Sequence, residues 1–137
     1  MRALGIDYGS KRVGVALGDT DSKVASPWGV IPNEGALALV ARIKEIVDRD
    51  EVKTIIVGIP RPLRDTSAEN EQVRAVRTFI ESLKGLGVEV VEADETLTSQ
   101  LAARQALEAG EREKRDDLAA AAILQGWLDQ IRNSNDE

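Results

Sequence analysis

The stretch that decides the fold lies near the N-terminus and reads Gly5-Ile6-Asp7-Tyr8-Gly9-Ser10-Lys11-Arg12-Val13-Gly14-Val15-Ala16. Its apolar parts predict two short strands, over Ala3 to Tyr8 and Val13 to Leu17, joined by a polar turn. Asp7 interrupts the first strand. Because aspartate is disfavoured within strands, Asp7 indicates either a functional carboxylate or a turn-forming residue that binds nearby backbone N–H groups.

Outward from this stretch, the first half of the chain continues with one more strand, a helix and a buried strand. Lys23 to Ile31 reads as an extended segment, and Pro27 within it favours an edge position. Glu34 to Asp50 is predicted to be an amphipathic helix. Its apolar residues at helical spacing are Leu37, Val40, Ala41, Ile43, Ile46 and Val47. Thr54 to Ile59 is apolar on both faces, which is typical of a buried parallel strand.

The second half predicts a further strand and three helices. Thr66 and Glu69 form a capping box for a helix that Gly85 and Gly87 end. The predicted buried stripe of this helix is Val73, Val76, Phe79, Ile80 and Leu83. The remaining predicted elements are a strand over Val88 to Val91 and helices over Thr98 to Ala109 and Asp116 to Ile131.

This order of elements predicts the fold class. Three tightly connected strands favour antiparallel pairing, whereas the later strand-helix-strand units favour parallel pairing. We therefore expect an α/β fold in one domain over residues 1–137. Its five-stranded mixed sheet would have three antiparallel strands followed by parallel strands, with helices on its faces.

The composition excludes several kinds of chemistry. The 137 residues include 24 acidic and 18 basic side chains, a net charge of −6, and no cysteine or histidine. Disulfides, thiolate or histidine metal sites and Ser-His-Asp catalysis are therefore excluded. The longest apolar run, Leu118 to Leu124, has seven residues, far below the roughly 20 that span a bilayer. With no signal-peptide pattern at the N-terminus, we expect a soluble, cytoplasmic protein that does not bind membranes.

The remaining candidates for chemistry are carboxylates in three places. Asp7 lies in the first strand, Asp94 and Glu95 follow the strand over Val88 to Val91, and Asp116 and Asp117 open the last helix. Carboxylates that converge repel one another, and a divalent cation such as Mg²⁺ or Mn²⁺ resolves this with oxygen ligands alone. Two such ions hydrolyse phosphodiesters without histidine. Each acid also has a structural reading, as a turn residue or at a helix N-terminus, and the spacing does not choose within either pair.

Four ordered blocks carry a resemblance to a known family. The opening stretch closely resembles the first motif of the YqgF family, also called RuvX, which comprises small bacterial proteins with an RNase H-like fold related to the RuvC resolvases. The other blocks, similar to the family in order and spacing, are Ile55 to Pro60, Asp94 to Ser99 and Asp116 to Gln125. The resemblance covers essentially the whole chain.

The resemblance implies which side chains form the site. Carried over by position, the catalytic, metal-binding carboxylates are Asp7, Glu95 and Asp116, with two Mg²⁺ or Mn²⁺ ions expected. It favours Asp116 over Asp117, and we prefer Glu95 over Asp94 because its longer side chain reaches back toward a shared ion. The candidates for substrate binding are Lys11, Arg12, Arg61 and Arg64. Thr96 stands where the family usually has arginine.

The resemblance further implies a metal-dependent endonuclease that processes the 5′ end of pre-16S rRNA. The alternatives are a Holliday junction resolvase acting on branched DNA and a non-catalytic nucleic-acid-binding module. Asp7-Tyr8-Gly9-Ser10 also fits the phosphate loop of sugar-kinase-type phosphotransferases, but those enzymes clamp nucleotide between two duplicated domains, and this length supplies one. The expected partner is structured RNA or branched DNA. The sequence leaves a homodimer open.

Overall fold

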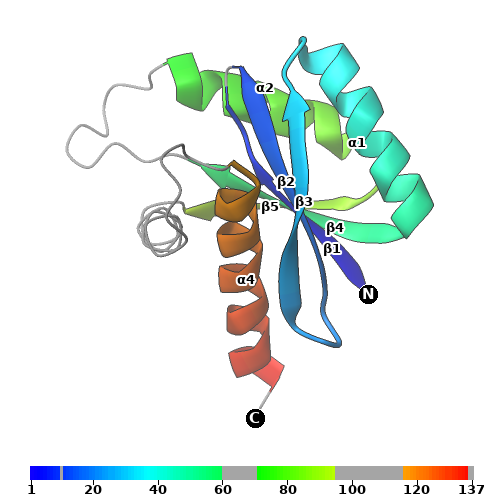
Figure 1. Ribbon diagram of the computed structural model, residues 1–137, viewed down its shortest axis with the longest axis vertical. Coiled ribbons are helices and arrows are strands. Elements are labelled where there is room, and N and C mark those ends of the chain that lie inside the picture. Colours follow the sequence, from blue (N-terminus) through cyan, green and yellow to red (C-terminus); the bar gives the residue numbers. More distant parts are fainter. Residues whose placement is uncertain (10, 60–70, 95–115, 136–137) are drawn as a thin grey trace, which may run out of the picture.

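The computed structural model describes residues 1–9, 11–59, 71–94 and 116–135, without the side chains of 71–73, 94, 116 and 132–135. In chain order, the elements are β1 (Arg2–Asp7), β2 (Arg12–Asp19), β3 (Val24–Pro32), α1 (Ala36–Asp50), β4 (Val52–Ile59), α2 (Glu71–Lys84), β5 (Glu89–Asp94) and α4 (Asp116–Asn135) (Figure 1). The predicted capping box at Thr66 and Glu69 and the predicted helix over Thr98 to Ala109 lie outside the described residues.

The five strands form one sheet in the order β3-β2-β1-β4-β5. β2 is antiparallel to β1 and β3, whereas β4 is parallel to β1 and β5. The predicted mixed sheet is confirmed, and Pro27 does lie on an edge strand. β4 is buried along its length except at Lys53, because helices cover both faces of the sheet at this strand.

One face of the sheet packs against α1 and α2 through large aliphatic side chains. From the helices, the buried residues are Leu39, Ile43, Ile46 and Val47 of α1 and Val76, Phe79, Ile80 and Leu83 of α2. The α1 stripe differs from the prediction, because Leu37 is 91% exposed and Leu39 is buried. Two residues along a helix turn the side chain by about 200°, so only one of these two leucines can face the sheet.

The other face packs against α4 and is lined by small residues. A Cβ atom at Gly5 would lie 2.7 Å from Leu124 Cβ and 2.8 Å from the Ala120 carbonyl oxygen. At Gly18, the nearest helix side chains are Leu124 and Leu128. Since Gly18 pairs with Ala3 near the start of β1, α4 runs antiparallel to β1. Its first turn therefore lies toward the carboxyl end of β1.

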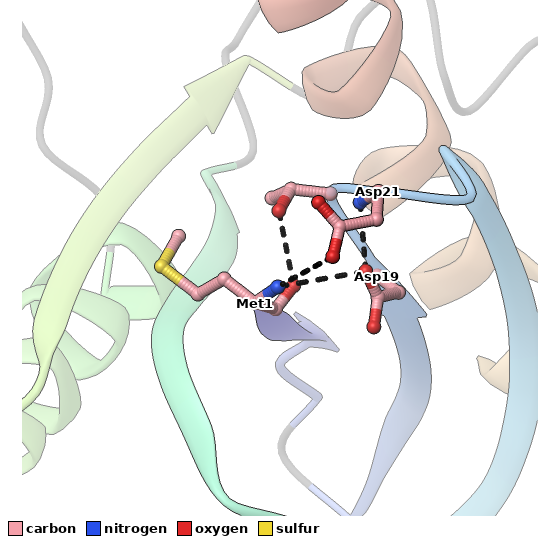
Figure 2. Close-up of polar contacts among 4 residues, drawn as sticks. Met1, Asp19 and Asp21 are labelled. Carbon is pink, nitrogen blue, oxygen red and sulfur yellow. Dashed lines mark hydrogen bonds and ion pairs between the residues drawn. The ribbon is translucent and has the colours of Figure 1, made fainter.

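The opposite end of the sheet is held by the N-terminus. The Met1 amine lies 3.6 Å from Asp19 Oδ1 and 3.5 Å from Asp21 Oδ2 (Figure 2). The Thr20 backbone N–H donates to the Met1 carbonyl oxygen at 2.8 Å. These contacts fasten β1 to the turn between β2 and β3. Over the described part of the chain, no helix combines the length and apolar character needed to cross a membrane.

Candidate functional site

Asp7 is the last residue of β1, and its side chain is nearly buried, at 7% exposure. Strand alternation places it on the same face as Ala3 and Gly5, the face that α4 covers. Its partner on β2 is Gly14. On β4, Gly58 follows Val57, the partner of Ile6. Because glycines flank Asp7 on both neighbouring strands, no side chain from those two positions fills the space beside the carboxylate.

The first turn of α4 brings further acids to this end of the sheet. The Ala120 carbonyl oxygen packs over Gly5, and Asp116 and Asp117 lie one helical turn before Ala120, toward Asp7. Asp117 is 7% exposed, and its Oδ1 accepts a hydrogen bond from the Leu118 backbone N–H at 3.0 Å. The Asp116 side chain is not among those the structure describes. The sequence did not predict that Asp117 is buried, and the resemblance favoured Asp116 in its place.

The carboxyl end of β5 lies at the same edge of the sheet. Asp94 is the last residue of β5 and pairs with Ile59, the last residue of β4. Val91 and Ala93 pack with the cluster on the α4 face, whereas Val90 packs with the cluster on the α1 and α2 face. Glu95 lies outside the described residues.

The donor set fits a hard cation. Among the residues the structure describes, nothing donates a hydrogen bond to the Asp7 carboxylate, so no described donor occupies its oxygens. The described side chains do not bring three possible ligands together, and Glu95 and the Asp116 side chain are not among them. Carboxylate oxygens are the ligands that Mg²⁺ and Mn²⁺ prefer, so Asp7 beside the acidic start of α4 is compatible with such an ion.

The segment after Asp7 is held from two sides. The Tyr8 ring packs on Phe79 of α2, with the ring centroids 5.0 Å apart. A Cβ atom at Gly9 would lie 2.3 Å from the Arg12 carbonyl oxygen, so the turn requires glycine there. Lys11 and Arg12 follow and are exposed at the same end of the sheet as Asp7. The two other predicted basic residues, Arg61 and Arg64, lie outside the described residues.

Solved structures with a similar fold include RuvC bound to a Holliday junction substrate and a Holliday junction resolvase. The chain aligns over 98% of its length with 97% of the chain in "T. thermophilus RuvC in complex with Holliday junction substrate", with a TM-score of 0.64 and 19% identity. The yeast mitochondrial Holliday junction resolvase Ydc2 aligns with a TM-score of 0.58 and 15% identity, over 96% of this chain and 82% of that one. These likenesses show that the fold is that of the RuvC-type, RNase H-like resolvases.

Sequence comparison identifies the family. Two curated relatives carry the name "Putative pre-16S rRNA nuclease". The one from Sulfurihydrogenibium sp. (strain YO3AOP1) is 34% identical, over 98% of this chain and 94% of the relative. The one from Agathobacter rectalis is 38% identical, over 98% of this chain and 99% of the relative. Residues 1–130 match the family described as "RuvX: Holliday junction resolvase". The chain, with Asp7 in its first strand and acids at the start of its last helix, therefore belongs to the RuvX (YqgF) family of resolvase-like nucleases.

Proposed function

We propose that this protein is a metal-dependent endonuclease that hydrolyses nucleic-acid phosphodiester bonds and processes the 5′ end of pre-16S rRNA. One observation carries the proposal. Asp7 is nearly buried beside two glycine positions and at the same end of the sheet as the acidic first turn of α4. The names of relatives that match almost the full chain support the rRNA substrate.

In this proposal, Asp7, Glu95 and Asp116 hold the metal. The family motif supports Glu95, whose side chain is longer than that of Asp94 and reaches further toward a shared ion. The family motif supports Asp116. The burial of Asp117 makes it the alternative ligand from the same helical turn.

Each part of the site has a chemical task. Bound Mg²⁺ or Mn²⁺, expected as two ions, would activate a water molecule and stabilise the leaving oxygen. Asp7 supplies a fixed oxygen ligand from the rigid sheet. The flanking glycines leave room for a phosphate group to approach that carboxylate. Lys11 and Arg12, together with Arg61 and Arg64, contact backbone phosphates, which positions the strand without reading its sequence.

A cleavage assay with matched substrates tests the proposal. The protein is incubated with Mg²⁺ or Mn²⁺ and with a pre-16S rRNA fragment, an unrelated single-stranded RNA or a four-way DNA junction. We expect cleavage of the rRNA precursor and a loss of more than about 100-fold in Asp7→Asn, because even residues behind metal ligands cost up to that much. Equal cleavage by Asp7→Asn would contradict the carboxylate site.

Metal binding gives a second readout that does not depend on activity. An ion that binds only the folded protein raises the melting temperature. We therefore expect Mn²⁺ to raise the melting temperature of the wild type more than that of Asp7→Asn. An equal rise in both proteins would place the ion elsewhere.

A resolvase is the second candidate function, favoured by the family description and by the RuvC likeness. Both functions use the same phosphodiester chemistry at the same carboxylates. The four-way junction in the cleavage assay separates them, since a resolvase cuts the junction in preference to both RNAs. A resolvase would also be expected to form a homodimer, which sedimentation of the protein with and without the junction tests.

A further inference from the structure

Asn33 contacts the turn that follows Asp7. This residue comes directly after β3, and its Nδ2 donates to the Gly9 carbonyl oxygen at 2.8 Å. Its backbone N–H donates to the Lys11 carbonyl oxygen at 2.9 Å. Its Oδ1 accepts from the Gly35 backbone N–H at 3.2 Å, just before α1 begins. Asn33 therefore joins three segments, and both ends of its side-chain amide are used.

These hydrogen bonds differ in what they support. The bond from the Asn33 backbone to Lys11 continues the antiparallel ladder of β2 and β3, whose last pair is Arg12 with Pro32. The bond from Oδ1 to Gly35 is a local turn at the start of α1. Of these three bonds, the one from Nδ2 to Gly9 is the one that ties the Asn33 side chain to the turn between Asp7 and Arg12. It belongs neither to the β2–β3 ladder nor to the start of α1.

We propose that Asn33 is a positioning residue for substrate binding, an inference that rests on the proposed function. By holding the Gly9 carbonyl, Asn33 fixes the direction in which the chain leaves Asp7 and presents the exposed Lys11 and Arg12. A phosphate contact depends on the placement of the cation as well as on its charge. Asn33 therefore acts through Lys11 and Arg12 and does not itself contact the reacting atoms.

One isosteric substitution separates the turn contact from the others. In Asn33→Asp, one carboxylate oxygen still accepts from Gly35, while the other faces the Gly9 carbonyl oxygen with no proton to donate. Gln125→Glu is a matched control at the far end of the sheet. Gln125 Oε1 accepts from the Ala25 N–H at 3.0 Å, and its Nε2 donates to the Lys23 carbonyl at 2.9 Å and to Asp129 Oδ1 at 3.1 Å. Each variant keeps an accepted bond, but Asn33→Asp loses one donated bond and Gln125→Glu loses two, so the control is the more disruptive change for stability.

The experiment compares steady-state cleavage of the rRNA fragment and the four-way junction by the wild type and both variants, with melting temperatures for each. We expect Asn33→Asp to raise KM by about tenfold, as for the loss of a hydrogen bond with added repulsion, while kcat stays within about twofold. Gln125→Glu should leave KM unchanged although its loss of melting temperature is equal or larger, because it also faces Asp129. In a Lys11→Ala, Arg12→Ala background, Asn33→Asp should have a smaller effect on KM, because contacting residues are not additive.

Two results would overturn the inference while the proposed function stands. One is an active wild type with equal KM values for Asn33→Asp and Gln125→Glu. The other is an effect of Asn33→Asp on KM that is as large in the Lys11→Ala, Arg12→Ala background as in the wild type. A wild type that binds these nucleic acids without cutting them would contradict the nuclease, and the inference would then be judged by Kd in place of KM. A wild type that neither binds nor cuts the rRNA fragment or the junction would contradict both the proposed function and the inference about Asn33.

Discussion

The two faces of the sheet are built from different kinds of residue. The face toward α1 and α2 is filled by large aliphatic side chains, such as Leu4 and Ile6 of β1. The face toward α4 has Ala3 and Gly5 at the alternate positions of the same strand. Because side chains alternate along a strand, β1 packs large residues against α1 and α2 and small residues against α4. We call these two sides of the sheet the thick face and the thin face.

The buried polar residues follow the same division. In the described part of the chain these are Asp7, Thr54 and Asp117. Asp7 and Thr54 have the parity of neighbours that pack on the α4 face, and Asp117 lies on α4 itself. The thick face holds the larger cluster of buried apolar side chains, whereas the thin face combines a smaller apolar cluster with the buried acids. The candidate site therefore lies on the face that contributes less apolar burial.

The largest expected effect tests the thick face. Phe79 is 1% exposed, and its ring packs on Tyr8. We expect Phe79→Ala to lower the free energy of unfolding by about 3–5 kcal/mol, from lost apolar burial and the cavity left behind. Urea unfolding measures this. If the candidate metal site toward α4 does not depend on this core, Mn²⁺ should still raise the melting temperature of the folded variant. Loss of that rise would show that the two faces are coupled through Tyr8.

Gly5→Ala, on the thin face, should destabilise the protein less than Phe79→Ala but should reduce cleavage more. In Gly5→Ala, the new methyl group would meet Leu124 Cβ and the Ala120 carbonyl oxygen within 2.8 Å, so α4 must shift. Such overpacking costs about 1–3 kcal/mol. We expect cleavage by the folded variant to fall by at least about tenfold, because a misplacement of about 1 Å at a reacting centre has large effects.

Gly85→Ala is the matched control for this change. It adds the same methyl group after α2, where the nearest heavy atom is the Ser82 carbonyl oxygen at 3.3 Å. The control should cleave as the wild type does. Unchanged activity in Gly5→Ala, measured at a temperature where the variant is folded, would show that the thin face does not position the acids.

Sequence patterns predicted the sheet well because its strands are marked by apolar runs of the right length. The apolar run over Thr54 to Ile59 and Pro27 correctly predicted a buried parallel strand and an edge strand of a mixed sheet. The α1 stripe was less accurate, since Leu37 and Leu39 both suit a helix and only packing distinguishes them. For the site, Asp7 was identified as an unusual residue within a strand. No local pattern indicated that Asn33 reaches Gly9, because the two residues are 24 positions apart and meet only through the pairing of β2 with β3.

The smallest effect concerns Asp19, a carboxylate that lies beside a backbone donor and the Met1 amine. The Asp21 backbone N–H donates to Asp19 Oδ1 at 2.7 Å and lowers the pKa of Asp19 below its ordinary value of 3.8, and the Met1 amine lowers this pKa further. A lowered folded-state pKa stabilises the protein above pH 3.8, and this contribution is lost as the pH falls through the lowered pKa. Asp7, by contrast, has no such donor among the described residues.

Asp19→Asn tests this contrast. The wild type should exceed the variant in urea midpoint near neutral pH, and the difference should shrink toward zero as the pH falls to about 2. Other carboxylates titrate in both proteins, so their contributions cancel in the difference. A gap that is the same at both pH values would mean that Asp19 acts through the shape of the β2–β3 turn and not through its charge. In that case the contrast between Asp19, which accepts a hydrogen bond from its own turn, and Asp7, which has no donor among the described residues, would not concern charge.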